Sequence, residues 1–319
     1  MTARPISVLA ALAAGAVLLS GCGGPTSAEE TTPSKGASAA APVTVAGIAI
    51  SVDGAARKAV PQKFLDAGTV RVATDVPYAP FEMFVSEGSQ DITGVDHDLG
   101  QAIGAKLGVK FVFTPQKFDG IIPAVQAGKF DAVISAMTDK KERQAALTFV
   151  DYSASGTGVL VAKGNPEKIT TYTDLCGKKV AVQAATNQLD LATAWQKECT
   201  AGGKGEIQIQ QFPKDSDAQL AIKAGKVVAA LATKPAAGYS AKTTDNGNAF
   251  EVVNDPAAPT GYQSTPNGIG VANKDKELAT AIQLALQSLM DDGSYTKILA
   301  TYGVEGIAID KATINAATS

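Results

Sequence analysis

The stretch FDGIIPAVQAGKFDAVISAMTDKKERQ, residues 118–144, carries the pattern that decides the fold. An apolar helical segment that ends in Ala-Gly-Lys is followed at once by small and β-branched residues at 132–134, which are typical of a covered strand. Thr138 and Asp139 then predict a helix N-cap with an acid in the first turn. A helix, a strand and a second helix in close succession indicate an α/β protein.

The same alternation begins at residue 69 and then repeats in a second round. The second round contains AQLAIKAGKVVAALAT, residues 218–233, which has the same order of helix, Ala-Gly-Lys and strand. Two rounds of this kind predict two similar lobes with mostly parallel strands. Short connections near residues 155–159 and 266–268 would let the chain leave the first lobe, build the second and return. A long amphipathic helix then follows, with apolar residues at Leu278, Ile282, Leu286 and Leu289.

The N-terminus predicts an export signal at residues 1–21, because one early cation, Arg4, precedes an apolar run too short for a comfortable membrane span. The run ends in Leu-Ser-Gly-Cys, which resembles the bacterial lipobox and predicts lipidation of Cys22. The body would then be extracytoplasmic and anchored to the cell membrane through Cys22. The alternative is an ordinary secretory signal with an incidental cysteine. Residues 22–56 are rich in small and polar residues and predict a flexible tether.

Two further cysteines, Cys176 and Cys199, remain after Cys22 is set aside. In an exported chain such a pair predicts a disulfide with only one connectivity. The loop-entropy model gives this bond about 3 kcal/mol of stabilisation. The alternative is a pair of buried free thiols.

Composition and motifs exclude several classes of function. The formal net charge is −3 with no block of Lys or Arg, so nucleic acid is not an expected partner. His97, the single histidine, lies between Asp96 and Asp98, and it is expected to be structural rather than part of a catalytic triad. Asp96 or Asp98 is expected to cap the following helix. Glycine-rich phosphate loops and calcium-loop spacing are absent from the sequence, so no metal and no cofactor is expected.

Several side chains instead indicate a binding site beyond the carboxyl ends of the strands. The aromatic residues Tyr78 and Phe118 lie near strand ends, and the hydroxyl residues Thr138 and Thr186 lie at predicted helix starts. Arg143 would be unfavourable near a helix N-terminus by up to about 1 kcal/mol, which an anionic ligand could offset. The alternative for this arginine is a surface ion pair with a neighbouring acid such as Glu142 or Asp139.

Over about residues 60–305 the chain resembles the polar amino-acid-binding proteins of bacterial ABC importers, the family 3 extracellular solute-binding proteins that include the glutamine- and histidine-binding proteins. The opening stretch is the most specific part of the resemblance. The other matching segments are VRVATDVPYAPFEMF at 70–84, GVDHDLGQAIGAKLG at 94–108 and DLCGKKVAVQAATNQ at 174–188. The resemblance implies a two-lobed, periplasmic-binding-protein-like α/β fold of type II, a Venus flytrap with two hinge strands. We expect lobe 1 at 57–156 and 269–313, and lobe 2 at 157–268.

The resemblance also implies a ligand site. In the family, the arginine matching Arg143 forks onto the ligand's α-carboxylate, which suits guanidinium geometry. Aromatic residues matching Tyr78 and Phe118 sandwich the aliphatic part, and an acid matching Asp75 reaches the polar side chain or the amine. The expected ligand-binding residues are Asp75, Tyr78, Phe118, Ala136, Thr138, Arg143, Gln183, Thr186, Asn187 and Thr233.

Two positions depart from the family pattern. Thr233 stands where the family usually has an aspartate that pairs with the ligand's α-ammonium, and Ala185 replaces a common glycine. A neutral hydroxyl forgoes a charge-assisted bond of about 1.5 to 3 kcal/mol. Either Asp75 takes over the amine, or the ligand is a carboxylate that lacks a free α-amine.

The resemblance therefore implies a monomeric, non-enzymatic lipoprotein that captures a small carboxylate-bearing solute, a polar amino acid or derivative, and delivers it to the permease of an ABC importer. One alternative is an enzyme on the same scaffold, similar to cyclohexadienyl dehydratase, which would need a general acid such as Asp75. Another alternative is a ligand-sensing lipoprotein that signals to a membrane kinase.

Overall fold

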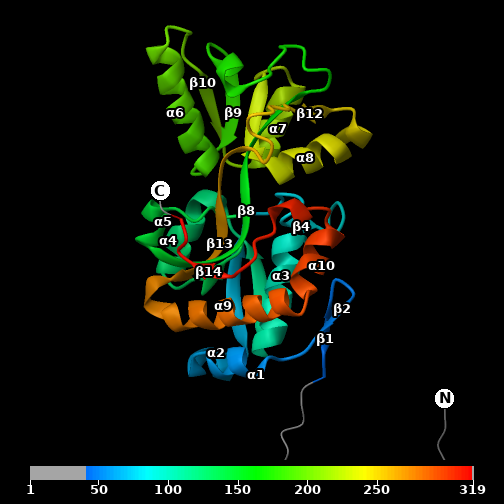
Figure 1. Ribbon diagram of the computed structural model, residues 1–319, viewed down its shortest axis with the longest axis vertical. Helices are drawn as coiled ribbons and strands as arrows, with labels where there is room; N and C mark the ends of the chain where they lie inside the picture. The colour runs from blue at the N-terminus through cyan, green and yellow to red at the C-terminus, as the bar shows by residue number, and fades with distance from the viewer. Residues whose placement is uncertain (1–40, 318–319) are drawn as a thin grey trace, which may run out of the picture. The chain divides into compact units, whose positions relative to one another are not determined.

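A computed structural model describes residues 41–317, which form a mixed α/β structure. Figure 1 shows two lobes within this part of the chain, connected by β8 and β13. The strands are β1 (Val43–Val45), β2 (Ile48–Ile50), β3 (Thr69–Thr74), β4 (Met83–Phe84), β5 (Ile92–Thr93), β6 (Lys110–Pro115), β7 (Ala132–Val133), β8 (Leu147–Ala162), β9 (Lys179–Gln183), β10 (Gln208–Phe212), β11 (Ala229–Thr233), β12 (Phe250–Val252), β13 (Tyr262–Ala272) and β14 (Thr313–Ile314).

The α-helices cover the strands of both lobes (Figure 1). They are α1 (Gly54–Lys58), α2 (Gln62–Ala67), α3 (Val95–Leu107), α4 (Ile121–Gln126), α5 (Lys141–Gln144), α6 (Asn187–Ala201), α7 (Asp215–Lys223), α8 (Lys234–Thr243), α9 (Lys276–Asp291) and α10 (Ser294–Thr301). The 3-10 helices are η1 (Phe118–Gly120), η2 (Tyr172–Leu175), η3 (Thr244–Gly247), η4 (Asn273–Asp275) and η5 (Glu305–Ile307). None of the helices placed between residues 41 and 317 is both long enough and apolar enough to cross a membrane.

The main strands are hydrogen-bonded in the order β10-β9-β11-β8-β13-β7-β3-β6. The pairs β3–β6, β3–β7, β9–β10 and β9–β11 are parallel, as the alternating pattern predicts, whereas β8 and β13 are antiparallel to their neighbours. The first part of β8 pairs with β13, and its last part, from residue 157 to residue 161, pairs with β11. The expected lobe boundaries at 156/157 and 268/269 fall inside these two long strands.

The predicted amphipathic helix is confirmed as α9. Its apolar residues Leu278, Ile282, Leu286 and Leu289 are fully buried. They face α3 and α1, which supply the partner face that such a helix requires. Burying four large aliphatic side chains contributes roughly 1.5 to 3 kcal/mol each, so α9 anchors the core of lobe 1.

The expected tether differs from the structure at its C-terminal end. Strands β1 and β2 form a hairpin whose Val45 and Ile50 side chains are buried in the core. Asp53 then caps α1 by accepting a hydrogen bond from the backbone N–H of Ala56 at 2.9 Å. Within the described residues the first regular element therefore begins at Val43, because this apolar patch packs against lobe 1. The expected signal peptide, Cys22 and the first part of the tether lie outside the described residues.

The predicted helix start at Thr138 is wrong. Thr138 forms an antiparallel bridge with Asn267, and the backbone N–H of Asp139 donates to the carbonyl of Pro266. These contacts keep the chain extended beside β13, and the short helix α5 begins only at Lys141. Arg143 is therefore the third of four helical residues, and the unfavourable dipole expected from the sequence does not apply to it.

The predicted cap of α3 is also wrong, because Gly94 rather than Asp96 or Asp98 occupies the N-cap. Gly94 has φ 124°, and a Cβ at this position would lie 2.3 Å from the carbonyl oxygen of Phe81, so only glycine fits. The buried Asp96 carboxylate instead accepts hydrogen bonds from the backbone N–H of Ala136 at 2.6 Å and from the Tyr152 hydroxyl at 2.7 Å. Its partners are distant in sequence, so its role is tertiary.

Residues 313–317 form a C-terminal strap across β8. The Thr313 hydroxyl and the backbone N–H of Ala316 donate to Asp151 at 2.9 and 3.1 Å. The backbone N–H of Ala317 donates to Asp139 at 3.0 Å, and Asp139 also accepts from Gln144 of α5 at 2.8 Å. The strap therefore supports the segment that carries Arg143. Burial raises the pKa of Asp151 to about 6, and the nearby Asp139 carboxylate adds to the rise.

The predicted disulfide between Cys176 and Cys199 is confirmed, with a Cα–Cα distance of 5.4 Å and a sequence separation of 23. It joins the end of η2 to α6, where Cys199 packs in a buried cluster with Trp195. The bond therefore ties the entrance of β9 to the helix that follows this strand.

We predict that replacing Asp151 with Asn changes the pH dependence of stability. A raised native pKa favours folding below the unfolded value near 3.8, and this contribution is lost as the pH rises through about 6. The wild-type free energy of unfolding should therefore fall, relative to that of Asp151→Asn, between pH 4 and pH 7. Urea denaturation at both pH values measures this difference, with the exposed Asp66→Asn as the control. A difference independent of pH would contradict the prediction.

We predict that the double variant Cys176→Ala/Cys199→Ala loses about 3 kcal/mol of unfolding free energy, because the unfolded chain gains loop entropy. Denaturant titration with and without reductant measures the loss. Reductant should destabilise the wild type and leave the double variant unchanged. Equal midpoints for the oxidised wild type and the double variant would rule out a stabilising role.

Candidate ligand-binding site

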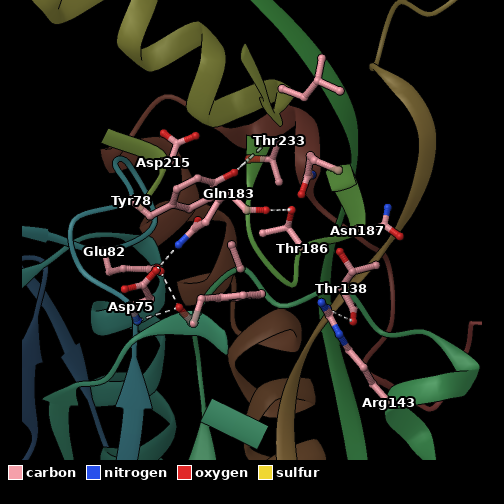
Figure 2. A pocket seen from close by; sticks show the side chains of 15 residues that line it. Asp75, Tyr78, Glu82, Thr138, Arg143, Gln183, Thr186, Asn187, Asp215 and Thr233 are labelled. Atoms are coloured by element: carbon pink, nitrogen blue, oxygen red, sulfur yellow. Dashed lines mark hydrogen bonds between the residues drawn. The ribbon is translucent and has the colours of Figure 1, made fainter. Parts of the chain in front are cut away.

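A pocket lies between the two lobes beyond the carboxyl ends of β3, β9 and β11. In this closed arrangement its cavity volume is about 20 Å³, which is space for little more than one water molecule. All the expected ligand-binding residues line it, and the structure brings them together from segments that are far apart in the chain (Figure 2). The lining residues that the sequence did not predict are Glu82, Ser135, Gln188, Asp215 and Leu231.

Arg143 is a buried cation at one end of this pocket, with 6% of its surface exposed. Its guanidinium donates to the carbonyls of Thr138 and Ala185, each at 2.9 Å, and lies 5.5 Å from the centre of the Phe118 ring. Burial lowers its pKa to about 10, so it stays protonated at neutral pH. No acid in the described part of the chain forms an ion pair with it, and the alternative of a surface pair with Glu142 or Asp139 is wrong. A buried cation without an anionic partner suits a carboxylate ligand.

The turn after β9 brings a helix N-terminus to the pocket. Ala185 has φ 62°, a left-handed conformation that favours glycine, and it occupies the position where the family commonly has one. Thr186 caps α6 as predicted, accepting from the backbone N–H of Leu189 at 3.3 Å and donating to the carbonyl of Gln183 at 2.7 Å. The Asn187 amide and the backbone N–H groups of this helix start therefore lie where an anion is favoured, whereas the Thr186 hydroxyl hydrogen is already bonded to Gln183.

Direct hydrogen bonds join the two sides of the pocket. The Tyr78 hydroxyl lies 3.0 Å from the Thr233 hydroxyl and accepts from the Thr233 backbone N–H at 2.8 Å. The Gln183 side chain donates to the Asp75 carboxylate at 2.5 Å. Tyr78 and Asp75 follow β3, whereas Thr233 and Gln183 end β11 and β9. These contacts hold the two lobes together across the site.

Acidic side chains occupy the end of the pocket that lies away from Arg143 (Figure 2). Glu82 is fully buried and accepts from Ser135 at 2.7 Å, while its second oxygen has no hydrogen-bond partner. Burial raises the pKa of Glu82 well above its usual range, and the neighbouring Asp96 raises it further. Burial also raises the pKa of Asp75, and it raises that of Asp215 to about 6. Each of these acids can therefore be stabilised as an anion by a cationic group of a ligand.

Glu82 carried a sequence signal that could have placed it in the site, because it interrupts the apolar run PFEMF directly after Tyr78 and Ala79. Asp215 carried none, since an acid in the first turn of a helix is already explained by the helix dipole. Between residues 41 and 317, no three or more His, Cys, Asp or Glu side chains are grouped to hold a metal ion.

Comparison with known proteins gives relatives of one kind. The arginine-binding protein ArgT of Corynebacterium glutamicum is 31% identical over 257 residues, which cover 80% of this chain and 81% of the relative. An ancestral arginine-binding protein bound to arginine has a TM-score of 0.66 and 34% identity, covering 74% of this chain and 98% of that structure. The ancestral amino acid-binding protein AncCDT-1, described as a precursor of cyclohexadienyl dehydratase, has a TM-score of 0.64 and 33% identity, covering 76% and 97%.

The family model of the bacterial extracellular solute-binding proteins, family 3, matches residues 70–305. This range includes β3, the whole of lobe 2 as expected from the sequence, both long connecting strands and α9. It therefore covers the pocket and the two-lobed α/β fold that forms it. The chain belongs to the bacterial extracellular solute-binding proteins, family 3.

Proposed function

We propose that this protein captures a polar amino acid or a related carboxylate outside the cytoplasmic membrane and delivers it to an ABC-type importer. The observation that carries the proposal is Arg143, a buried guanidinium that lines the interlobe pocket and has no acidic partner among the described residues. The names of the relatives support an amino acid as the solute, since ArgT is an arginine-binding protein.

The pocket suggests how the solute is held. The Arg143 guanidinium forks onto a ligand carboxylate, and the Thr138 hydroxyl and the N-terminus of α6 supply further donors to it. Tyr78 and Phe118 contact the aliphatic part from opposite segments of lobe 1. A ligand that binds both lobes favours the closed arrangement, because it contacts both sides only when they are together. The permease would then receive the closed, loaded form.

We also propose the division of the chain. Residues 57–156 and 269–313 form lobe 1 together with residues 43–56, whose hairpin and start of α1 pack on it, and residues 157–268 form lobe 2, with the crossings in β8 and β13. Residues 1–21 serve as a signal peptide, Cys22 carries the lipid, and the tether ends at residue 42 because β1 begins at Val43. A monomer is sufficient for this function, since residues of one chain line the pocket.

Binding rather than catalysis is our proposal for the pocket, because the curated relatives are named as binding proteins. A dehydratase would need a general acid that reaches a leaving group, and Asp75 is the residue that the sequence suggested. Mass spectrometry of the small molecule that co-purifies with the protein tests both roles. An unchanged ligand recovered from a tight complex supports binding, and turnover of a prephenate-like acid would support the enzyme.

We predict that Arg143→Ala weakens binding of every carboxylate ligand by at least about a hundredfold, because two charge-assisted hydrogen bonds are lost. A thermal-shift panel of amino acids and amine-free carboxylates identifies a ligand for the wild type, and calorimetry then measures the variants. Lys141→Ala is the matched control, since it removes an exposed cation from the same short helix. Wild-type affinity in Arg143→Ala would reject the site.

We predict that Cys22→Ala releases the protein from the membrane fraction of producing cells, because the lipid can no longer be attached. Cell fractionation and metabolic labelling with a radioactive fatty acid measure the effect. A Cys176→Ala/Cys199→Ala chain should still be labelled, which controls for loss of cysteine as such. Unchanged labelling of Cys22→Ala would favour an ordinary secretory signal.

A further inference from the structure

The pocket carries opposite charges at its two ends. Figure 2 shows Arg143 and Thr138 at one end, and Asp75, Glu82 and Asp215 gathered around Tyr78 at the other. The acids come from separate elements: Asp75 follows β3, Glu82 precedes β4 and Asp215 begins α7. A ligand that spans the pocket therefore meets a cation at one end and carboxylates at the other.

The acidic end has fewer protein partners than buried carboxylates need. Asp75, Glu82 and Asp215 are 7%, 0% and 5% exposed, and none of them forms an ion pair within residues 41–317. Asp215 accepts only from Gln219 of its own helix, at 2.7 Å, whereas Glu82 lies against Asp96, whose charge adds to the rise in the pKa of Glu82. Buried charges of this kind are costly unless a cation pairs with them. This end of the pocket is therefore suited to a cationic group.

Among the described residues that line the pocket, none at the Arg143 end is an acid that could receive an ammonium group beside the ligand carboxylate. The polar side chains there are hydroxyls and an amide, namely those of Thr138, Thr186 and Asn187. Thr233, which stands where the family usually has the aspartate that pairs with the α-ammonium, offers a neutral hydroxyl, and this group and its backbone N–H are already bonded to Tyr78. An α-ammonium group would therefore find neutral acceptors only, whereas a cation at the far end of the ligand would find carboxylates.

We propose that the pocket selects a carboxylate that carries its cation at the distal end, an ω-amino or ω-guanidino acid, with Asp215 as a specificity-determining residue and the α-amino group contributing little. The inference rests on the proposed function, because it takes Arg143 as the carboxylate site. Asp75 and Asp215 approach the distal cation from lobe 1 and lobe 2 respectively, so the cation helps to join the lobes.

Calorimetry with L-arginine and its two truncated analogues tests the inference on the wild-type protein. 5-Guanidinopentanoate lacks the α-amino group, and its affinity should lie within about tenfold of that of arginine. L-Norvaline lacks the guanidinium group and should bind at least about a hundredfold more weakly, because buried carboxylates are left unpaired. The series L-lysine, 6-aminohexanoate and L-norleucine distinguishes an ammonium from a guanidinium as the preferred distal cation.

Single substitutions test which residues produce the preference for a distal cation. Asp215→Asn should reduce the ratio of arginine affinity to norvaline affinity by at least about tenfold. Asp217→Asn, on the same helix but outside the pocket lining, should leave that ratio unchanged. Thr233→Asp should raise the ratio of arginine affinity to 5-guanidinopentanoate affinity by about tenfold, because a carboxylate then stands opposite the α-ammonium. A general loss of stability lowers both affinities in a ratio equally, so the ratio itself is unaffected. The comparison of ligands on the wild-type protein remains informative even if one variant does not fold.

The outcomes separate this inference from the proposed function. A larger than tenfold loss on removing the α-amino group, or norvaline binding within a hundredfold of arginine, overturns the inference. Binding of a neutral amino acid such as glutamine without binding of the cationic acids also overturns it, while the proposed function stands. Failure of the wild type to bind any carboxylate counts against the proposed function itself.

Discussion

The antiparallel pairing of β8 with β13 is the constraint on which the rest of the structure depends. Within lobe 1 the two strands lie so close to their neighbours that a Cβ at Gly270 would stand 2.8 Å from the side chains of Leu147 and Val133. The same pair of strands positions residues 138–139, because Thr138 forms a bridge with Asn267 and the backbone N–H of Asp139 donates to the carbonyl of Pro266. The connection between the lobes and the segment leading to Arg143 thus both depend on β13.

Charge separation in the pocket follows from this arrangement. Arg143 is contributed by a short helix after an extended segment, and the acids that line the pocket come from three other segments, so none of these acids forms an ion pair with the guanidinium within residues 41–317. Such uncompensated groups reduce the stability of the folded chain and are retained where they bind a ligand. The disulfide, the buried face of α9 and the C-terminal strap lie outside the pocket and offset part of this cost. Stability and binding are therefore assigned to different parts of the chain.

Local sequence patterns predicted those features whose causes are themselves local. The spacing of apolar residues in α9 and the Thr186 cap of α6 are examples, since each depends on residues three or four positions apart. Thr138 and Asp96 also looked like helix caps. Thr138 instead pairs with Asn267, 129 residues further along the chain, and Asp96 accepts from Ala136, 40 residues further along. Asp215 was missed for the same reason, because only the packing of α7 against the pocket distinguishes it from an exposed acid. The family resemblance supplied the other pocket residues, which no local pattern could have placed together.

The C-terminal strap has a mechanical consequence. The backbone N–H of Ala317, its last described residue, donates to Asp139. Asp139 also accepts from Gln144 of α5, the helix that contains Arg143. Gln144 also donates directly to the carbonyl of Ala317 at 3.2 Å, so a load applied at Ala317 is transmitted through these hydrogen bonds to α5. Immobilising the protein by its C-terminus in a surface-based binding assay would therefore apply force to α5, the helix that carries Arg143 and whose role in binding the assay would measure. Attachment at the exposed Lys204, in the loop between α6 and β10, leaves that linkage unloaded.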